Sequence, residues 1–216
     1  MDQGSGAGTG EYPPERHLAI TYAPPARRAA LAALFALDDV LAAVLRTTRD
    51  PMVGQMRLTW WHDALTALDH APPPAQPVLR QLARDVLPLG VTGAALAGIV
   101  EGWEELLAAD PIPDAALLAF ARGRGGLFVA GGVGAGDPLA AAGAGWALAD
   151  LAAHARDPVL AARARALAAP LLDAAVAVRW SRPNRAFGAL AHLARLPDAS
   201  APRRVGRALW HRLTGL

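Results

Sequence analysis

Residues 50–65, DPMVGQMRLTWWHDAL, and residues 27–39, RRAALAALFALDD, decide the fold class of this chain. Their apolar side chains recur every three or four positions, the spacing that places them on one face of an α-helix. Asp50 is an N-cap acceptor, and Pro51 suits a first helical turn, so the pair marks a helix start. The two stretches therefore predict consecutive core helices.

Aspartate followed by proline recurs at Asp137 and Asp157, and each pair predicts a further helix start. The expected helices are 26–47, 51–70, 77–87, 93–109, 114–122, 138–155, 158–179, 184–195 and 202–214. Strand-like alternation is missing, and about a quarter of the residues are alanine, which favours helix. We expect an all-α, single-domain helical bundle over residues 16–216, preceded by a disordered tail over residues 1–15.

The composition excludes several classes of enzyme. All 21 basic residues are arginine and cysteine is absent, so Schiff-base lysines, P-loop lysines, thiol nucleophiles and cysteine-ligated zinc are excluded. None of the three serines lies in a nucleophile elbow. The sequence shows no signal peptide and no apolar segment suited to spanning a membrane, so we expect a cytoplasmic protein, with the inner face of the membrane as an alternative location.

Adjacent Asp38 and Asp39 close the apolar run of residues 27–39. Neighbouring positions diverge by about 100° around a helix, so only one of these carboxylates can point into a given cavity. Magnesium bound to a diphosphate needs several carboxylate oxygens on one face, but the positions four residues further on are Ala42 and Ala43. A solvated or capping acid pair is the simpler interpretation.

Glu101, Glu104 and Glu105 share one face of a helix that Thr92 is expected to cap. Such a cluster either repels in solvent or holds a cation. Because the residues between them supply no further oxygen ligand, a solvated helix face is the simpler interpretation.

Asp150 and His154 also have helical spacing, but the next acid, Asp157, is expected to cap the following helix, which leaves too few metal ligands. The glycines of residues 123–136 do not form the dinucleotide-binding pattern, and no strand precedes them. Small residues that let helices or a ligand approach closely are the better interpretation.

Two further groups of side chains are candidates for binding. Arg57 lies one turn before Trp61, so its guanidinium could stack on the indole, and a core role for the tryptophan is equally favoured. Beyond residue 178 the chain is strongly basic. Its last helix combines an apolar face with candidate membrane-surface residues, namely Arg203, Arg204, Arg207 and Trp210. Docking on the chain's own bundle or on a protein partner is an alternative, and nucleic acid is not expected.

These residues give the chain a resemblance to the squalene/phytoene synthase family, the all-helical head-to-head prenyl transferases. The helix from Arg28 is similar to the family's opening helix, and residues 120–126 are similar to its stretch of small residues. Residues 50–65 resemble the E-P-x-x-G-x-x-R-L-x-W-W-R-D-A-L motif of the branch that contains a mitochondrial complex I assembly factor and its bacterial relatives. The binding residues that the resemblance suggests are Arg28, Arg57, Trp60, Trp61 and Asp63.

The resemblance implies an isoprenoid synthase fold, in which active members hold magnesium between two acid-rich helical motifs. In this chain the first motif falls near Ala42 and Ala43, and the second falls near Asp150, with His154 in place of an acid. Both motifs therefore lack metal ligands, and we expect no metal and no cofactor.

Three functions remain open at this stage. The first is a non-catalytic member of the family, an assembly or lipid-associated factor for respiratory complex I with a protein partner or an isoprenoid in its cavity. The second is a terpenoid-forming prenyl transferase that acts on farnesyl or geranylgeranyl diphosphate with magnesium, using catalytic residues Asp38, Asp39, Glu101, Glu105 and Asp150. The third is a peripheral adaptor on an anionic membrane.

Overall fold

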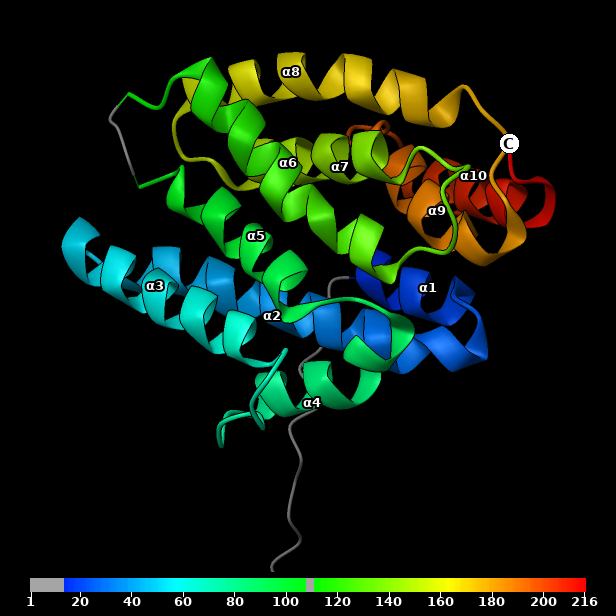
Figure 1. The fold of residues 1–216 in the computed structure, drawn as a ribbon. Helices are drawn as coiled ribbons and strands as arrows, with labels where there is room; N and C mark the ends of the chain where they lie inside the picture. Colours follow the sequence, from blue (N-terminus) through cyan, green and yellow to red (C-terminus); the bar gives the residue numbers. More distant parts are fainter. Residues whose placement is uncertain (1–13, 108–110) are drawn as a thin grey trace, which may run out of the picture.

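A computed structural model describes residues 14–107 and 111–216, and these residues form helices without any strand (Figure 1). The α-helices are α1 (Pro14–Tyr22), α2 (Arg28–Thr47), α3 (Pro51–Ala67), α4 (Pro77–Asp85), α5 (Gly93–Glu104), α6 (Asp114–Gly131), α7 (Leu139–His154), α8 (Pro158–Val176), α9 (Arg185–Ala194) and α10 (Ala201–Thr214). The all-α prediction is confirmed. The expected disordered tail falls largely on residues 1–13, outside the described residues, and α1 already includes Pro14 and Glu15.

Three of the predicted helix starts have the cap that the sequence indicates. The Asp50 side chain accepts a hydrogen bond from the Met52 amide at 2.9 Å, and the Asp157 side chain accepts from the amides of Val159 and Leu160. Thr92 caps α5 in the same way. These contacts satisfy amides that have no partner within the first helical turn.

Asp137 is an exception among the predicted caps. α7 begins just after it, at Leu139, but the Asp137 carboxylate caps no amide of that helix. It accepts hydrogen bonds from the Ser181 amide at 2.9 Å and from Asn184 Nδ2 at 2.7 Å. Asp137 therefore ties the start of α7 to the segment before α9, and the capping prediction is wrong at this position.

Two helices depart most from the prediction: α1 was not predicted, and α6, which was expected to end at residue 122, continues to Gly131. A Cβ at Gly123 would lie 2.5 Å from the Cα of Gly102 in α5, and a Cβ at Gly125 would lie 2.5 Å from the backbone nitrogen of Ala144 in α7. The glycines therefore let three helices touch backbone to backbone, and this packing outweighs their low helix propensity. The close-approach interpretation of these glycines is confirmed.

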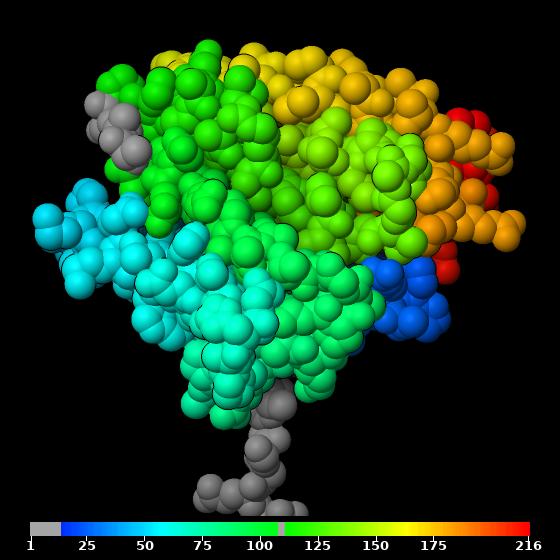
Figure 2. Space-filling view, in the orientation of Figure 1, coloured from blue at the N-terminus to red at the C-terminus, as the bar shows by residue number. Residues whose placement is uncertain are grey.

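The bundle is arranged around α7, which contacts α6, α8 and α9 (Figure 1). Its residues from Ala142 to Leu148 are all buried. On the other side of α6 lie α5, α2 and α3, and α3 forms one edge of the molecule (Figure 2). α1 returns to lie beside α9, so both ends of the described chain meet on one side of the bundle.

Candidate functional site

The centre of the bundle contains Arg124 of α6, whose side chain is 2% exposed. Its Nε and Nη2 donate hydrogen bonds to the two carboxylate oxygens of Asp38 on α2, both at 2.8 Å. Its Nη1 lies 2.7 Å from Asp150 Oδ2 on α7 and donates to the Ala147 carbonyl at 3.4 Å. One guanidinium therefore joins two acids that are 112 positions apart along the chain.

A second arginine completes this arrangement from α1. Arg16 donates to Asp38 Oδ2 and to Asp39 Oδ1, each at 2.6 Å. We define the buried charge cluster as Arg16, Asp38, Asp39, Arg124 and Asp150. The Asp38 side chain is fully buried while that of Asp39 is 48% exposed, so the two acids do diverge as the helix geometry requires. The interpretation of Asp38 as a solvated or capping acid is wrong, because it has two guanidinium partners inside the core.

Aromatic rings enclose the charge cluster. The Arg124 Cζ atom lies 4.5 Å from the ring centre of Trp146 and 4.8 Å from that of Trp103, within cation–π range. Phe128 packs against Trp146 with ring centres 5.3 Å apart. Aromatic side chains thus surround the Arg124 guanidinium at the centre of the bundle.

The neighbouring charges set the ionisation of the cluster. Burial works to lower the pKa of Arg124, and the charges of Asp38 and Asp150 outweigh it, so the pKa lies above its ordinary value. Burial also works to raise the pKa of Asp150, but the charge and hydrogen bond of Arg124 lower it below its ordinary value. For Asp39 burial is the larger effect and raises the pKa, although Arg16 opposes it. Asp150 and Arg124 therefore form a stable ion pair.

The donor set of the cluster does not suit magnesium. This ion needs octahedral coordination by free oxygens at about 2.0–2.1 Å, whereas both oxygens of Asp38 already accept hydrogen bonds from guanidinium groups. Nowhere in residues 14–107 and 111–216 do three or more histidine or acidic side chains come together as a metal site would require. Asp38 and Asp150 do face each other, but a permanent cation fills the space between them.

The other acids of the prenyl transferase hypothesis do not join this cluster. Glu101 is exposed on α5, with an oxygen 3.4 Å from His62 Nε2 on α3, and Glu105 lies at the end of α5. At the positions where the resemblance places the first acid motif, Ala42 packs against the hydrophobic core. The structure thus brings Asp38, Asp39 and Asp150 together and leaves Glu101 beside α3.

The binding residues suggested by the resemblance point in different directions. Arg28 donates to the carbonyls of Thr21 and Ala23, where it fixes the turn between α1 and α2. The Arg57 guanidinium donates to the side chains of Thr47 and Thr48 at 3.2 and 2.9 Å, so it links α3 to the end of α2. Both arginines thus join neighbouring helices by local contacts.

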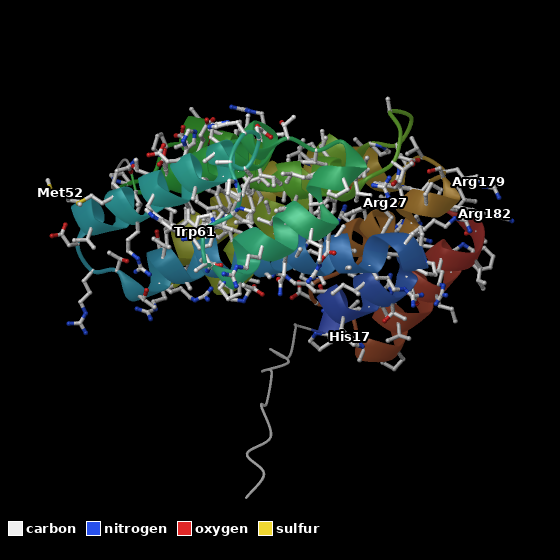
Figure 3. All side chains as sticks on the ribbon, turned by 60° about the horizontal axis from the view of Figure 1, so that its bottom comes forward. His17, Arg27, Met52, Trp61, Arg179 and Arg182 are labelled. Carbon is white, nitrogen blue, oxygen red and sulfur yellow. The ribbon has the colours of Figure 1, made fainter. Side chains whose placement is uncertain are left out.

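The tryptophan pair is divided between core and surface. Trp61 is buried in the bundle, whereas Trp60 is about half exposed and meets Trp61 edge to face, with ring centres 5.2 Å apart. Trp60 and Asp63 line a groove on the outside of α3 together with Met56 and Met52, and Met52 lies at the outer end of the helix (Figure 3). The core interpretation therefore holds for Trp61.

The charged residues of α10 also divide between two faces. Arg204 pairs with Glu15 and donates to the Leu193 carbonyl at 3.3 Å, and Arg207 Nε donates to His192 Nδ1 at 3.2 Å. Arg203 and Trp210 are exposed. Two of the arginines expected at a membrane surface therefore face the body of the protein.

Sequence reasoning missed the two cations of the charge cluster, Arg16 and Arg124. A signal for Arg124 does exist, because this arginine stands between two glycines, Gly123 and Gly125. Gly123 lets α5 and Gly125 lets α7 pack closely on either side of Arg124, which is buried between these helices.

Comparison with known proteins identifies the family of this chain. The squalene/phytoene synthase family model matches residues 11–127, just over half of the chain, a span that runs from before α1 to within α6. Asp150 lies outside the matched span. No curated protein and no solved structure matches the chain. On the strength of the family match and its all-helical fold, the chain belongs to the squalene/phytoene synthase family.

Proposed function

We propose that this chain is a non-catalytic member of the squalene/phytoene synthase family. The observation that carries the proposal is the pair of acids Asp38 and Asp150 held by Arg124, with 2% of the arginine exposed. A guanidinium cannot lose its proton in a protein and offers no lone pair to a metal. The negative charges of Asp38 and Asp150 are therefore compensated by Arg124 within the protein.

The chemistry of prenyl transfer explains why this arrangement opposes catalysis. Breaking the allylic bond of a prenyl diphosphate leaves a highly charged leaving group, which needs metal ions positioned beside it. Four of the five Arg124 hydrogen-bond donors have partners within the protein: two on Asp38, one on Asp150 and one on the Ala147 carbonyl. Arg124 itself is thus poorly placed to take over the role of a metal toward a diphosphate.

For the biological role we propose an assembly or lipid-associated factor for respiratory complex I. The support is the resemblance of residues 50–65 to the motif of the complex I assembly branch, together with the exposed apolar side chains of Met52, Met56 and Trp60 on α3, which suit contact with a protein partner. Deleting the gene in its host should lower the amount of assembled complex I on native gels, and the wild-type gene should restore it. Unchanged complex I in the deletion strain would refute this role.

Catalysis is tested by incubating the purified chain with farnesyl or geranylgeranyl diphosphate and magnesium, beside an active family member as a positive control. We expect no coupled product. The competing hypothesis is a true prenyl transferase, and the convergence of Asp38 and Asp150 is the observation in its favour. Product formation that an Asp150→Asn variant abolishes would establish that hypothesis and reject ours.

A further inference from the structure

Helix α10 is amphipathic, but its apolar face is turned outward. Ala208 and His211 are its buried residues, and its inward face also carries Arg204 and Arg207, both hydrogen-bonded to the body of the protein. The outward face exposes between 47% and 67% of four large apolar side chains, namely Val205, Leu209, Trp210 and Leu213, and Leu216 just beyond the helix is 47% exposed. A surface helix normally turns such a face to the core, so an apolar face turned outward indicates contact with another apolar surface.

The apolar row is bordered by positive charge. Val205, Leu209 and Leu213 follow one another at four-residue spacing along the exposed side, the arrangement of a continuous stripe. Exposed Arg203 and Arg212 lie on the same helix, and the chain contains no acid after residue 198.

The end of α10 adjoins a second group of arginines. Arg179 Nε donates to the Thr214 carbonyl at 3.0 Å, and Arg182 lies close to Arg179 at the same end of the molecule (Figure 3). The exposed side of α10 is therefore an apolar stripe with a cationic border.

We propose that α10 docks in the plane of an anionic lipid bilayer. Leucine, valine and tryptophan side chains enter the boundary between headgroups and acyl chains, while the arginine side chains extend to the lipid phosphates. Within residues 14–107 and 111–216 no helix is suited to crossing a bilayer, so contact through this face lies in the interface plane. A second copy of the chain fits less well, because two α10 faces would bring their arginine borders together without an acid to neutralise them.

This proposal is independent of the question of catalysis, and vesicle co-sedimentation of the full chain tests it. We expect binding to mixed phosphatidylglycerol–phosphatidylcholine vesicles, weaker binding at high salt, and little binding to phosphatidylcholine alone. Leu209→Ser/Leu213→Ser should abolish binding. Arg203→Gln/Arg212→Gln should weaken it about 25-fold, since one arginine near an anionic surface contributes about fivefold.

Matched controls come from the other side of the molecule. Met52→Ser/Met56→Ser alters an apolar pair on α3 that is at least as exposed as Leu209 and Leu213. Arg80→Gln/Arg122→Gln removes two exposed charges elsewhere, and both variants should bind vesicles like the wild type. Equal loss of binding in the α3 variant would overturn the proposal. Absence of wild-type binding, or lipid-free self-association that Leu209→Ser/Leu213→Ser abolishes, would also overturn it.

Fluorescence gives a second measurement that tolerates small changes in stability. Trp210 is 54% exposed on the proposed contact face, whereas Trp60 is the exposed tryptophan of α3. Brominated lipids should quench the wild-type emission, and the Trp210→Phe variant should lose that quenching while Trp60→Phe retains it. Quenching that depends on Trp60 instead would assign membrane contact to α3 and reject the role of α10.

Discussion

The adjacent acids Asp38 and Asp39 offer a direct test of the buried charge cluster. Asp38→Asn leaves the guanidinium groups of Arg16 and Arg124 short of a buried negative charge, and removing one partner of a buried ion pair costs about 3–5 kcal/mol. Asp39→Asn changes a side chain that is 48% exposed, and a pair of this kind contributes about 1 kcal/mol or less. The same chemical change at neighbouring positions should therefore differ several-fold in its effect on stability.

Urea unfolding at neutral pH measures the free energy of unfolding of both variants. We expect the slope of this free energy against urea concentration to stay the same as in the wild type. For a domain of this size about 1 kcal/mol corresponds to about 2–4 °C, so Asp38→Asn should lower the melting temperature by about 6–20 °C. Asp39→Asn should lower it by a few degrees at most. Equal losses in the two variants, or a larger loss for Asp39→Asn, would refute the assignment of Asp38 as the buried partner of both arginines.

Three further predictions concern Arg124, Gly123 and His192. Arg124→Met should destabilise the chain by about 3–5 kcal/mol in urea unfolding, because Asp38 and Asp150 lose their shared cation; a neutral effect would contradict the ion-pair account. Gly123→Ala should destabilise by about 1–3 kcal/mol, since its Cβ would meet the α5 backbone, whereas Gly98→Ala on open surface should not. Burial lowers the pKa of His192 to about 3 from 6.5. Below pH 6.5 the unfolded chain therefore binds a proton at His192 that the folded chain does not, so the free energy of unfolding should decrease as the pH falls from about 6.5 to about 3. His192→Gln should reduce the slope of the unfolding free energy against pH by up to about 1.4 kcal/mol per pH unit. An unchanged slope would contradict the burial of a neutral His192.

Much of the fold could be predicted from sequence because it depends on local signals. The capping contacts of Asp50, Asp157 and Thr92 join residues two or three positions apart, so their spacing along the chain is sufficient to predict them. The end of α6 could not be predicted in this way. Its glycines lower helix propensity locally, and only the close contact with α5 and α7 makes them favourable.

In the charge cluster, too, the local geometry could be predicted from the sequence and the long-range contacts could not. The divergence of Asp38 and Asp39 follows from helix geometry alone, and it is present in the structure. The partners of Asp38, however, are Arg16, 22 residues away on α1, and Arg124, 86 residues away on α6, and no spacing rule connects positions so far apart. The alanines at positions 42 and 43 indicated missing metal ligands. The pairing of Arg124 with Asp38 and Asp150 depends on how α2, α6 and α7 pack together, and the sequence alone did not predict it.

The charge cluster compensates the negative charge of acids that are buried in the bundle. A bundle with Asp38 and Asp150 in its core and no cation beside them would hold two uncompensated carboxylates, which is strongly unfavourable. Arg124 and Arg16 neutralise them, and the rings of Trp103 and Trp146 pack on the Arg124 guanidinium. The two arginines thus compensate the buried negative charge of these acids.

Magnesium titration of the wild-type chain, followed by calorimetry and by melting temperature, tests this central claim most directly. We predict no saturable binding and no rise in melting temperature at millimolar magnesium, because Arg124 already occupies the space between Asp38 and Asp150. Saturable binding that the Asp150→Asn variant abolishes would contradict the account.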